Sequence, residues 1–489
     1  MRSAPYEPTP AANRHRAMPP AVTLPGVFLG ALLGALVLVA RPTEAQQTAP
    51  AAPPSAEAQA NSAQATLATA DEVLQQMSRI TGLPIKAPLK KELVSKSDVE
   101  QYLKDNLHAE YTAAEMHGEE AALKAFGVVP PDFSLERFLV SFYTEQAAGF
   151  YDPRRQTMFM ADWVEPDQQK VVLAHELTHA LQDQSFDLWK FTHAVRDNDD
   201  ALTARAALVE GYATLSMMQV MLGSVPVEKL PSLDSMIEQG LNQSMASFPV
   251  YSSAPFFMRF QLLFPYLQGM RFSRRALEIG GWRRLNQTFT DPPSTTRQIF
   301  EPDLYFSNRP APDGSNGWNP ATAVAAQPQP KADELALPPP PSLEHVAGVQ
   351  QVESNVMGAL GYYALFGQLL TEAESRKVSS TWVADRYLVY EGPSPGQLIL
   401  VSRTRWTSPK AAADFCADYR AILAKRSPGG DASKPIPQAG SASGDPNIFV
   451  RTSGSRRTLV LSKGDECRWF EGAPAEQADA LGGWLGSLQ

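Results

Sequence analysis

Two histidines four positions apart, His175 and His179, flank Glu176 in the stretch VVLAHELTHALQDQ, residues 171 to 184. On an α-helix, residues four apart lie on one face with Cβ atoms about 5–6 Å apart, so both imidazoles can bind one metal ion. Glu176 points about 100° around the same helix, where its carboxylate can hold a water molecule beside the metal without binding the metal itself. The spacing therefore assigns metal binding to the two histidines and leaves proton transfer to Glu176.

The pattern is uncommon in a chain with so few histidines. There are 7 histidines among 489 residues, and a chance His-Glu-x-x-His is expected about once in a hundred such chains. The preceding residues, Val171 to Ala174, are apolar and predict a buried helix, in which an unsatisfied imidazole or carboxylate is costly. These observations favour a metal site, and a pair of core histidines is the alternative.

A catalytic zinc ion needs a third protein ligand and leaves its fourth position to water. Glu210, in the apolar stretch AALVEGYATL, follows His179 by 31 residues on a second predicted helix. A carboxylate in such surroundings needs a reason to be buried, and metal binding supplies one; a glutamate on the helix surface is the alternative. The other candidates fit less well, because His15 lies in the N-terminal leader, His193 in a polar loop and His345 beyond a Pro-rich stretch.

Three segments, HELTHALQDQ, ALVEGYAT and DPPSTTRQIFEPDLY, together resemble the gluzincin group of zinc metallopeptidases, and within it a set of little-characterised exported bacterial proteins. The resemblance extends loosely from residue 140 to 305. It implies a zinc ion held by His175, His179 and Glu210, with Glu176 as the general base. It also implies a zincin-like fold and a peptide or protein substrate.

Two positions depart from that pattern. Thermolysin-like enzymes carry an acidic residue one turn after the glutamate ligand, where it orients a histidine, and this chain has Thr214 there. Relatives often have a histidine in the third segment where this chain has Phe300. With Thr214, the residues that orient the ligands stay undetermined. With Phe300, the chain is expected to be a slow or differently tuned enzyme if the histidine of the relatives stabilises the transition state.

Peptide hydrolysis also needs a hydrogen-bond donor for the tetrahedral oxyanion. Tyr212 and Tyr266 are the candidates, although an aromatic residue in an apolar helix more often belongs to the core. Residues 149 to 161 predict a β-hairpin around Asp152-Pro153. Its second strand, TMFMA at 157 to 161, is predicted to accept an extended peptide along its edge, and an ordinary sheet strand is the alternative.

The fold class is predicted to be α+β. A mainly helical zincin-like domain with a small β-hairpin or sheet is followed by a smaller C-terminal α+β domain. Helices are expected at about 166–188 and 199–222, whereas RYLVYE, QLILVSRTRW and IFVRTSGSRRTLVLS indicate strands of the C-terminal domain. The predicted division is a signal peptide at 1–45, a disordered linker at 46–65, the zincin-like domain at 66–305, a Pro-rich linker at 306–344 and the C-terminal domain at 345–489.

The N-terminus has the pattern of an export signal. Arg14 and Arg16 precede an uncharged apolar stretch at 21–40, and Ala45 ends a small-residue cleavage site. An uncleaved anchor is the alternative, since 20 residues are just enough to span a bilayer, and this segment is the only membrane contact predicted. The formal charge of −9, without a conspicuously basic stretch, argues against a nucleic-acid partner.

The two cysteines, Cys416 and Cys467, fit an exported protein, because an oxidising compartment would let them pair. Two buried free thiols are the alternative. Asp197, Asp199 and Asp200 cluster at the start of a predicted helix. We interpret them as helix caps and partners of the helix dipole rather than as calcium ligands.

The sequence therefore predicts a zinc-dependent metallopeptidase, periplasmic or extracellular, that acts on peptides or proteins. The alternative is a catalytically weak or inactive envelope binding protein with the zincin fold. The intact Glu176 favours the enzyme, because a purely structural metal site has no use for a carboxylate at that position. Metal-assisted hydrolysis of a non-peptide amide is a third interpretation, which the spacing does not separate from peptide cleavage.

Overall fold

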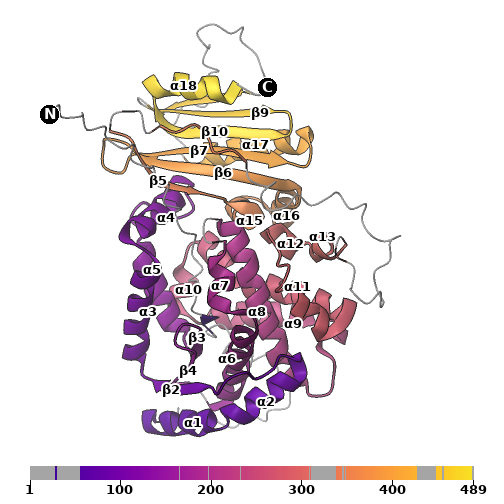
Figure 1. Ribbon diagram of the computed structural model, residues 1–489. Coiled ribbons are helices and arrows are strands. Elements are labelled where there is room, and N and C mark those ends of the chain that lie inside the picture. Colours follow the sequence, from indigo (N-terminus) through magenta and orange to yellow (C-terminus); the bar gives the residue numbers. More distant parts are fainter. Residues whose placement is uncertain are drawn as a thin grey trace, which may run out of the picture.

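The computed structural model shows an α+β fold, with a mainly helical part below a six-stranded sheet (Figure 1). The described residues are 28–29, 55–307, 309, 337–343, 346, 348–426 and 448–486, apart from positions 165, 196, 197, 232, 454 and 455. The predicted signal peptide, except residues 28–29, and most of the predicted Pro-rich linker lie outside them. Among the helices in these ranges, none combines the length and the hydrophobicity that a bilayer crossing requires.

The helical part is built from short and medium-length helices around the long helices α6, α8 and α11. Its helices are α1 (Ala56–Ala68), α2 (Ala70–Thr81), α3 (Lys96–Glu110), α4 (Ala113–Ala125), α5 (Leu135–Gln146), α6 (Pro166–Phe186), α7 (Leu188–His193), α8 (Asp199–Leu222), α9 (Leu233–Met245), α10 (Pro249–Ser253), α11 (Phe256–Gln287), α12 (Thr296–Phe300) and α13 (Pro302–Phe306). α8 begins where the Asn198 side chain accepts a hydrogen bond from the N–H of Ala201, which satisfies one of the unpaired donors of the first turn.

The first helix contradicts the prediction of a disordered linker from 46 to 65. α1 begins at Ala56, and the hydroxyls of Ser62 and Thr66 donate to the Gln169 side chain of α6 at 3.1 and 2.6 Å. The segment lacks large apolar residues, which is why its composition predicted disorder, but alanine has the highest helix propensity. The prediction is therefore wrong from residue 56 onward.

Helices α8 and α11 cross with their backbones in contact. A Cβ atom on Gly211 would lie 1.9 Å from the carbonyl carbon of Gly269, and one on Gly269 would lie 1.9 Å from the carbonyl oxygen of Ala207. No side chain fits at such distances in a close-packed interior. Glycine on both helices therefore allows α11 to lie directly against the helix that carries Glu210.

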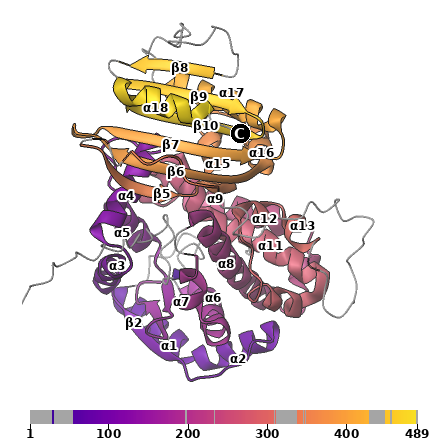
Figure 2. The same cartoon turned by 45° about the horizontal axis from the view of Figure 1, so that its top comes forward.

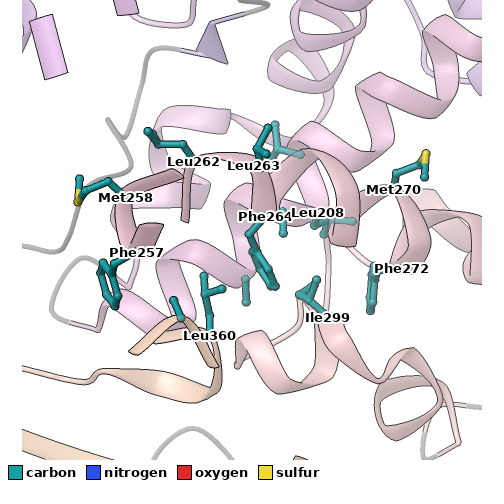
Figure 3. Packing of buried hydrophobic residues seen from close by; sticks show 14 of the residues in the cluster. Leu208, Phe257, Met258, Leu262, Leu263, Phe264, Met270, Phe272, Ile299 and Leu360 are labelled. Atoms are coloured by element: carbon teal, nitrogen blue, oxygen red, sulfur yellow. The ribbon is translucent and has the colours of Figure 1, made fainter. Parts of the chain in front are cut away.

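An apolar cluster next to this crossing joins segments that are far apart in the sequence. Figure 3 shows Leu208 of α8 and Phe264 of α11 close to Ile299 of α12 and Leu360 of α15. All four side chains are almost completely buried. The helical part thus includes α15 (Gly358–Gly367) in its core.

The small sheet has the strand order β1-β3-β4-β2. β3 (Gly149–Asp152) and β4 (Thr157–Ala161) form the predicted antiparallel hairpin, and β2 (Lys90–Val94) pairs in parallel with β4. β1 (Phe28–Leu29) pairs antiparallel with the outer edge of β3. The prediction that residues 157–161 form an edge strand is wrong, because β2 covers the second edge of β4.

The upper part is an antiparallel sheet in the order β5-β6-β7-β10-β9-β8, and Figure 2 shows these strands stacked from β8 down to β5 beside the helical part. Its strands are β5 (Gln350–Asn355), β6 (Trp382–Glu391), β7 (Leu398–Trp406), β8 (Ile448–Ser453), β9 (Arg456–Lys463) and β10 (Glu466–Pro474), and its other helices are α16 (Glu372–Thr381), α17 (Pro409–Arg426) and α18 (Ala475–Gly486). β5 and β10 were not predicted from the sequence.

Helices cover both faces of this sheet. α17 packs against β7, β9 and β10, and α18 packs against β9 and β10 from the other side. Neighbouring strand residues divide accordingly, with Val389 in the apolar cluster of α17 and Leu388 in that of α18. The predicted cysteine pair is confirmed: Cys416 of α17 and Cys467 of β10 form a disulfide with their Cα atoms 5.9 Å apart.

The boundary predicted at residue 345 does not separate two cores. α15 packs against α8, α11 and α12, and one apolar cluster runs from Leu208 of α8 through Leu360 of α15 to Trp469 of β10. At the start of α8, the Asp200 carboxylate accepts hydrogen bonds from the N–H and the hydroxyl of Thr296, and the same hydroxyl accepts one from the N–H of Leu360 on α15. The C-terminal part therefore completes the core of the helical part.

A chain that ends at residue 344 is expected to lose cooperative folding. Removing α15 uncovers apolar faces of α11 and α12, and each buried apolar side chain contributes about 1.5–3 kcal/mol against a typical total of about 5–15 kcal/mol. Thermal unfolding followed by circular dichroism, with the full chain as the control, measures the effect. A sharp transition at the temperature of the full chain would contradict the shared core.

Replacing Cys416 and Cys467 together with alanine is expected to lower the free energy of unfolding by about 4 kcal/mol. The disulfide joins residues separated by 51 positions, and without it the unfolded chain gains the freedom of that open loop. Urea unfolding of the full chain measures the change. The control is wild-type protein unfolded in the presence of a reductant, which should have the same stability as the variant. If the variant and the oxidised wild type are equally stable, the disulfide does not stabilise the fold.

Candidate metal centre

Helices α6 and α8 bring together three side chains of the types that can bind a metal. The Nε2 atoms of His175 and His179 lie 2.9 Å apart, and the Oε2 atom of Glu210 lies 3.1 Å from the first and 3.5 Å from the second. Ligands of one tetrahedral zinc ion, at about 2.0–2.1 Å from the metal, are separated by roughly 3.3 Å. The triangle formed by these three atoms therefore has the size that a single small ion requires.

The electrostatics of the site keep His175 and Glu210 in the forms that can bind a metal. Burial lowers the pKa of His175 to about 4, so its imidazole is neutral at neutral pH. Burial raises the pKa of the Glu210 carboxyl, but the imidazoles of His179 and His175 outweigh this and lower it to about 2. A neutral imidazole and an ionised carboxylate are the states in which both side chains donate a lone pair to a metal.

Glu176 lies beside this triangle. Its carboxylate and the two imidazoles each offer a ligand atom within 4.8 Å of the others, and its Oε2 atom accepts a hydrogen bond of 2.8 Å from the N–H of Tyr151 on β3. The side chain is completely buried. The small sheet therefore fixes one oxygen of Glu176 next to the two histidines.

Gln182, which was not predicted from the sequence, contacts one of the two imidazoles. Its Oε1 atom lies 2.8 Å from Nδ1 of His179, and its Nε2 atom donates to the carbonyl of Val209 on α8 at 3.1 Å. A partner on the second ring nitrogen fixes the tautomer and the direction of a metal-binding imidazole. The only signal in the sequence was its position three residues after His179, on the same face of the helix.

Thr214 does not take over the role of the missing acidic residue. Its hydroxyl donates to the backbone carbonyl of Glu210 at 2.8 Å, one turn back on the same helix. Phe300 packs against Phe264 and Tyr363 in an aromatic cluster. Neither residue contacts an imidazole of the centre, so Gln182 is the side chain that orients His179.

Tyr266 of α11 reaches the centre. Its ring centroid lies 6.4 Å from that of His175, and its hydroxyl hydrogen-bonds to Glu210. Burial raises the pKa of Tyr266 well above its ordinary value, and the negative charge of Glu210 raises it further. The hydroxyl therefore keeps its proton and can act as a hydrogen-bond donor at this point.

Tyr212 does not reach the centre, and its prediction as an oxyanion donor is wrong. Its hydroxyl donates to the side chain of Asn286 at 2.7 Å, and its ring packs edge-on against Trp282 and Phe289. Two positions along a helix correspond to about 200°, so Tyr212 points away from the side on which Glu210 lies. It belongs to the core between α8 and α11.

Comparisons with known proteins concern the C-terminal part alone. Residues 344–481 match the model of a family described as a domain of unknown function, DUF8575. This match covers less than a third of the chain and contains none of the residues of the centre. No curated protein and no solved structure matches the chain.

Gln182→Ala is expected to weaken metal binding by about 10–100-fold, because His179 loses the partner that orients it. Zinc competition with a chelating dye measures the affinity. Gln184→Ala is the matched control, since Gln184 also lies on α6 and hydrogen-bonds to the backbone of residues 86 and 87 but contacts no imidazole. Equal weakening by both substitutions would assign the effect to the stability of α6 instead.

Proposed function

We propose that the protein is an exported zinc-dependent metallopeptidase with a zincin-like catalytic part. The observation that carries this proposal is the convergence of His175, His179 and Glu210 on one point, with Glu176 held beside them as a separate carboxylate. Metal binding and proton transfer are thus assigned to different side chains that lie next to one another. A core histidine pair has no need for either carboxylate.

The donor set fits zinc. Two imidazole nitrogens and one carboxylate oxygen are a common ligand set of catalytic zinc, and they leave a fourth position for water or substrate. A zinc ion bound there supplies a Lewis acid, which polarises a carbonyl group and makes a water molecule more acidic.

Glu176 is assigned the proton transfers. The N–H of Tyr151 holds one of its oxygens, so the carboxylate stays beside the ligand triangle. From that position it takes a proton from the attacking water and later donates it to the leaving amine. Tyr266, which keeps its proton and contacts Glu210, is the proposed donor to the oxyanion that forms on the substrate carbonyl.

The outer edge of β3 is the proposed platform for an extended substrate, in place of β4. β1 pairs with this edge in antiparallel register, Phe28 opposite Tyr151 and Leu29 opposite Phe150, so the edge can pair with an extended segment. β1 lies within the predicted signal peptide at 1–45, and cleavage of that peptide would leave the edge open to a substrate. Tyr151 also contacts Glu176, so a peptide added here lies next to the proposed base. Main-chain pairing of this kind holds a peptide whatever its side chains are.

Export is part of the proposal and is supported by the disulfide between Cys416 and Cys467, since such bonds form and persist in oxidising compartments. One observation favours the alternative of an envelope binding protein without turnover. His175, Glu176 and His179 are completely buried, so a substrate reaches them only after the chain that covers them moves.

Glu176→Gln is expected to retain the metal and to lose peptide hydrolysis by about 10²–10⁴-fold, the usual contribution of a general base. Cleavage of a peptide library measures the activity, and elemental analysis measures the metal content. Glu72→Gln, at an exposed position of α2, is the control and should behave as wild type. Equal activity in wild type and Glu176→Gln would remove the proposed base, and retained zinc without cleavage in either would favour the binding protein.

A further inference from the structure

One tyrosine of β3 connects two acids of α6. Tyr151 donates its N–H to Oε2 of Glu176 at 2.8 Å and its phenol to Oδ2 of Asp183 at 2.9 Å. Seven positions correspond to two helical turns less about 20°, so both carboxylates lie on one face of α6, about 10 Å apart along the helix axis. Tyr151 therefore spans the interval between the two acids, with its backbone at one and its side chain at the other.

The carboxylate of Asp183 is fixed from a second side. Its Oδ1 atom accepts a hydrogen bond of 3.0 Å from the N–H of Leu188, the first residue of α7. The residue is buried, with 9% of its surface exposed. Each of its two oxygens thus has a donor of its own, and the direction in which the acceptor faces Tyr151 is set by the start of α7.

The surroundings keep the phenol of Tyr151 a hydrogen-bond donor. Burial raises the pKa of Tyr151, and the charge of Asp183 raises it further. The phenol therefore keeps its proton at neutral pH. Burial also raises the pKa of Asp183, and the hydrogen bonds from Tyr151 and Leu188 act in the opposite direction.

The strand β3 is short and lies beside α6 (Figure 1). At its start, a Cβ atom on Gly149 would lie 2.9 Å from Cγ1 of Val172, so the strand and the helix are in close contact there. At its end, Asp152 accepts a hydrogen bond from the hydroxyl of Tyr102, which belongs to α3. Between these two points, the hydrogen bonds of Tyr151 attach the strand to α6.

We propose that Asp183 is a positioning residue of the peptidase centre and that it acts through the phenol of Tyr151. By holding the tyrosine on α6, Asp183 keeps the Tyr151 N–H within hydrogen-bond distance of Glu176, and so keeps the proposed base beside the ligand triangle. The inference rests on the proposed function, because it gives Glu176 a supporting group for the proton transfers assigned to it above.

The test is a double-mutant cycle in the full chain, with kcat and KM for a peptide substrate as the measurements. Tyr151→Phe removes the phenol and keeps the backbone N–H. It is expected to lower kcat by about 10-fold with little change in KM, which is part of the roughly 100-fold that a displacement of about 1 Å can cost. Asp183→Ala should lower kcat to the same extent, and should cause no further loss of kcat in the Tyr151→Phe chain.

The rival explanation is a merely structural role, because Asp183 also binds the start of α7. Under that explanation, Asp183→Ala lowers kcat by the same factor whether residue 151 is tyrosine or phenylalanine, and this result would overturn the proposal. Wild-type kcat in Tyr151→Phe would overturn it too. Tyr419→Phe is the matched control, since its hydroxyl also donates to a carboxylate, that of Glu471, but lies in the C-terminal part. It should keep the wild-type kcat.

A second measurement does not need turnover. In the full chain labelled with ¹⁵N-tyrosine, the amide signal of Tyr151 is the one that Tyr151→Phe removes, and a hydrogen bond to a carboxylate shifts an amide proton downfield. Glu176→Gln and Asp183→Ala should both move this signal upfield, and Tyr419→Phe should leave it in place. A signal that moves in Glu176→Gln but not in Asp183→Ala contradicts the positioning role. If the wild type cleaves no peptide, the proposed function fails, and this signal still decides whether Asp183 holds Tyr151 on Glu176.

Discussion

The structure depends on the burial of α8, which packs against α6, α11 and the C-terminal part on its different sides. One side meets α6, where Glu210 reaches the two imidazoles. The next residue, Gly211, lies against the backbone of α11. The first turn meets the C-terminal part, since the N–H of Asp199 donates to the side chain of Asn355 and the Asp200 carboxylate accepts a hydrogen bond from the backbone of Ala359. Since 17 of its 24 residues are buried, a shift of α8 toward one neighbour would disturb all the others.

Features that depend on near neighbours in the chain were predictable from the sequence. The hairpin around Asp152, the bounds of α6 and α8 and the α+β class follow from local patterns of apolar, turn and capping residues. The common face of His175 and His179 follows from helix geometry alone. The pairing of Cys416 with Cys467 needed only the assumption of an oxidising compartment.

Features that depend on distant partners were not predictable. Tyr212 and Tyr266 occur in similar apolar helices, and only the crossing of α8 and α11 decides that Tyr266 faces His175 and Glu210. β2 has the sequence KKELV, a weak strand signal, yet it pairs with β4 and makes that strand interior. Gln182 stood beside the motif in the sequence, but a glutamine has many roles, and its contact with His179 needed the structure.

The place of α15 in the core has a consequence for synthesis. Its residues fill the space beside α11 and α12, yet it follows α12 by almost 60 positions. At about 5–20 residues per second, a ribosome needs several seconds to add that stretch, and for that time the apolar surfaces of the two earlier helices have no cover. During this interval a holding chaperone can bind the nascent chain, or neighbouring chains can aggregate with it. The interval ends only when α15 has been synthesised and covers these surfaces.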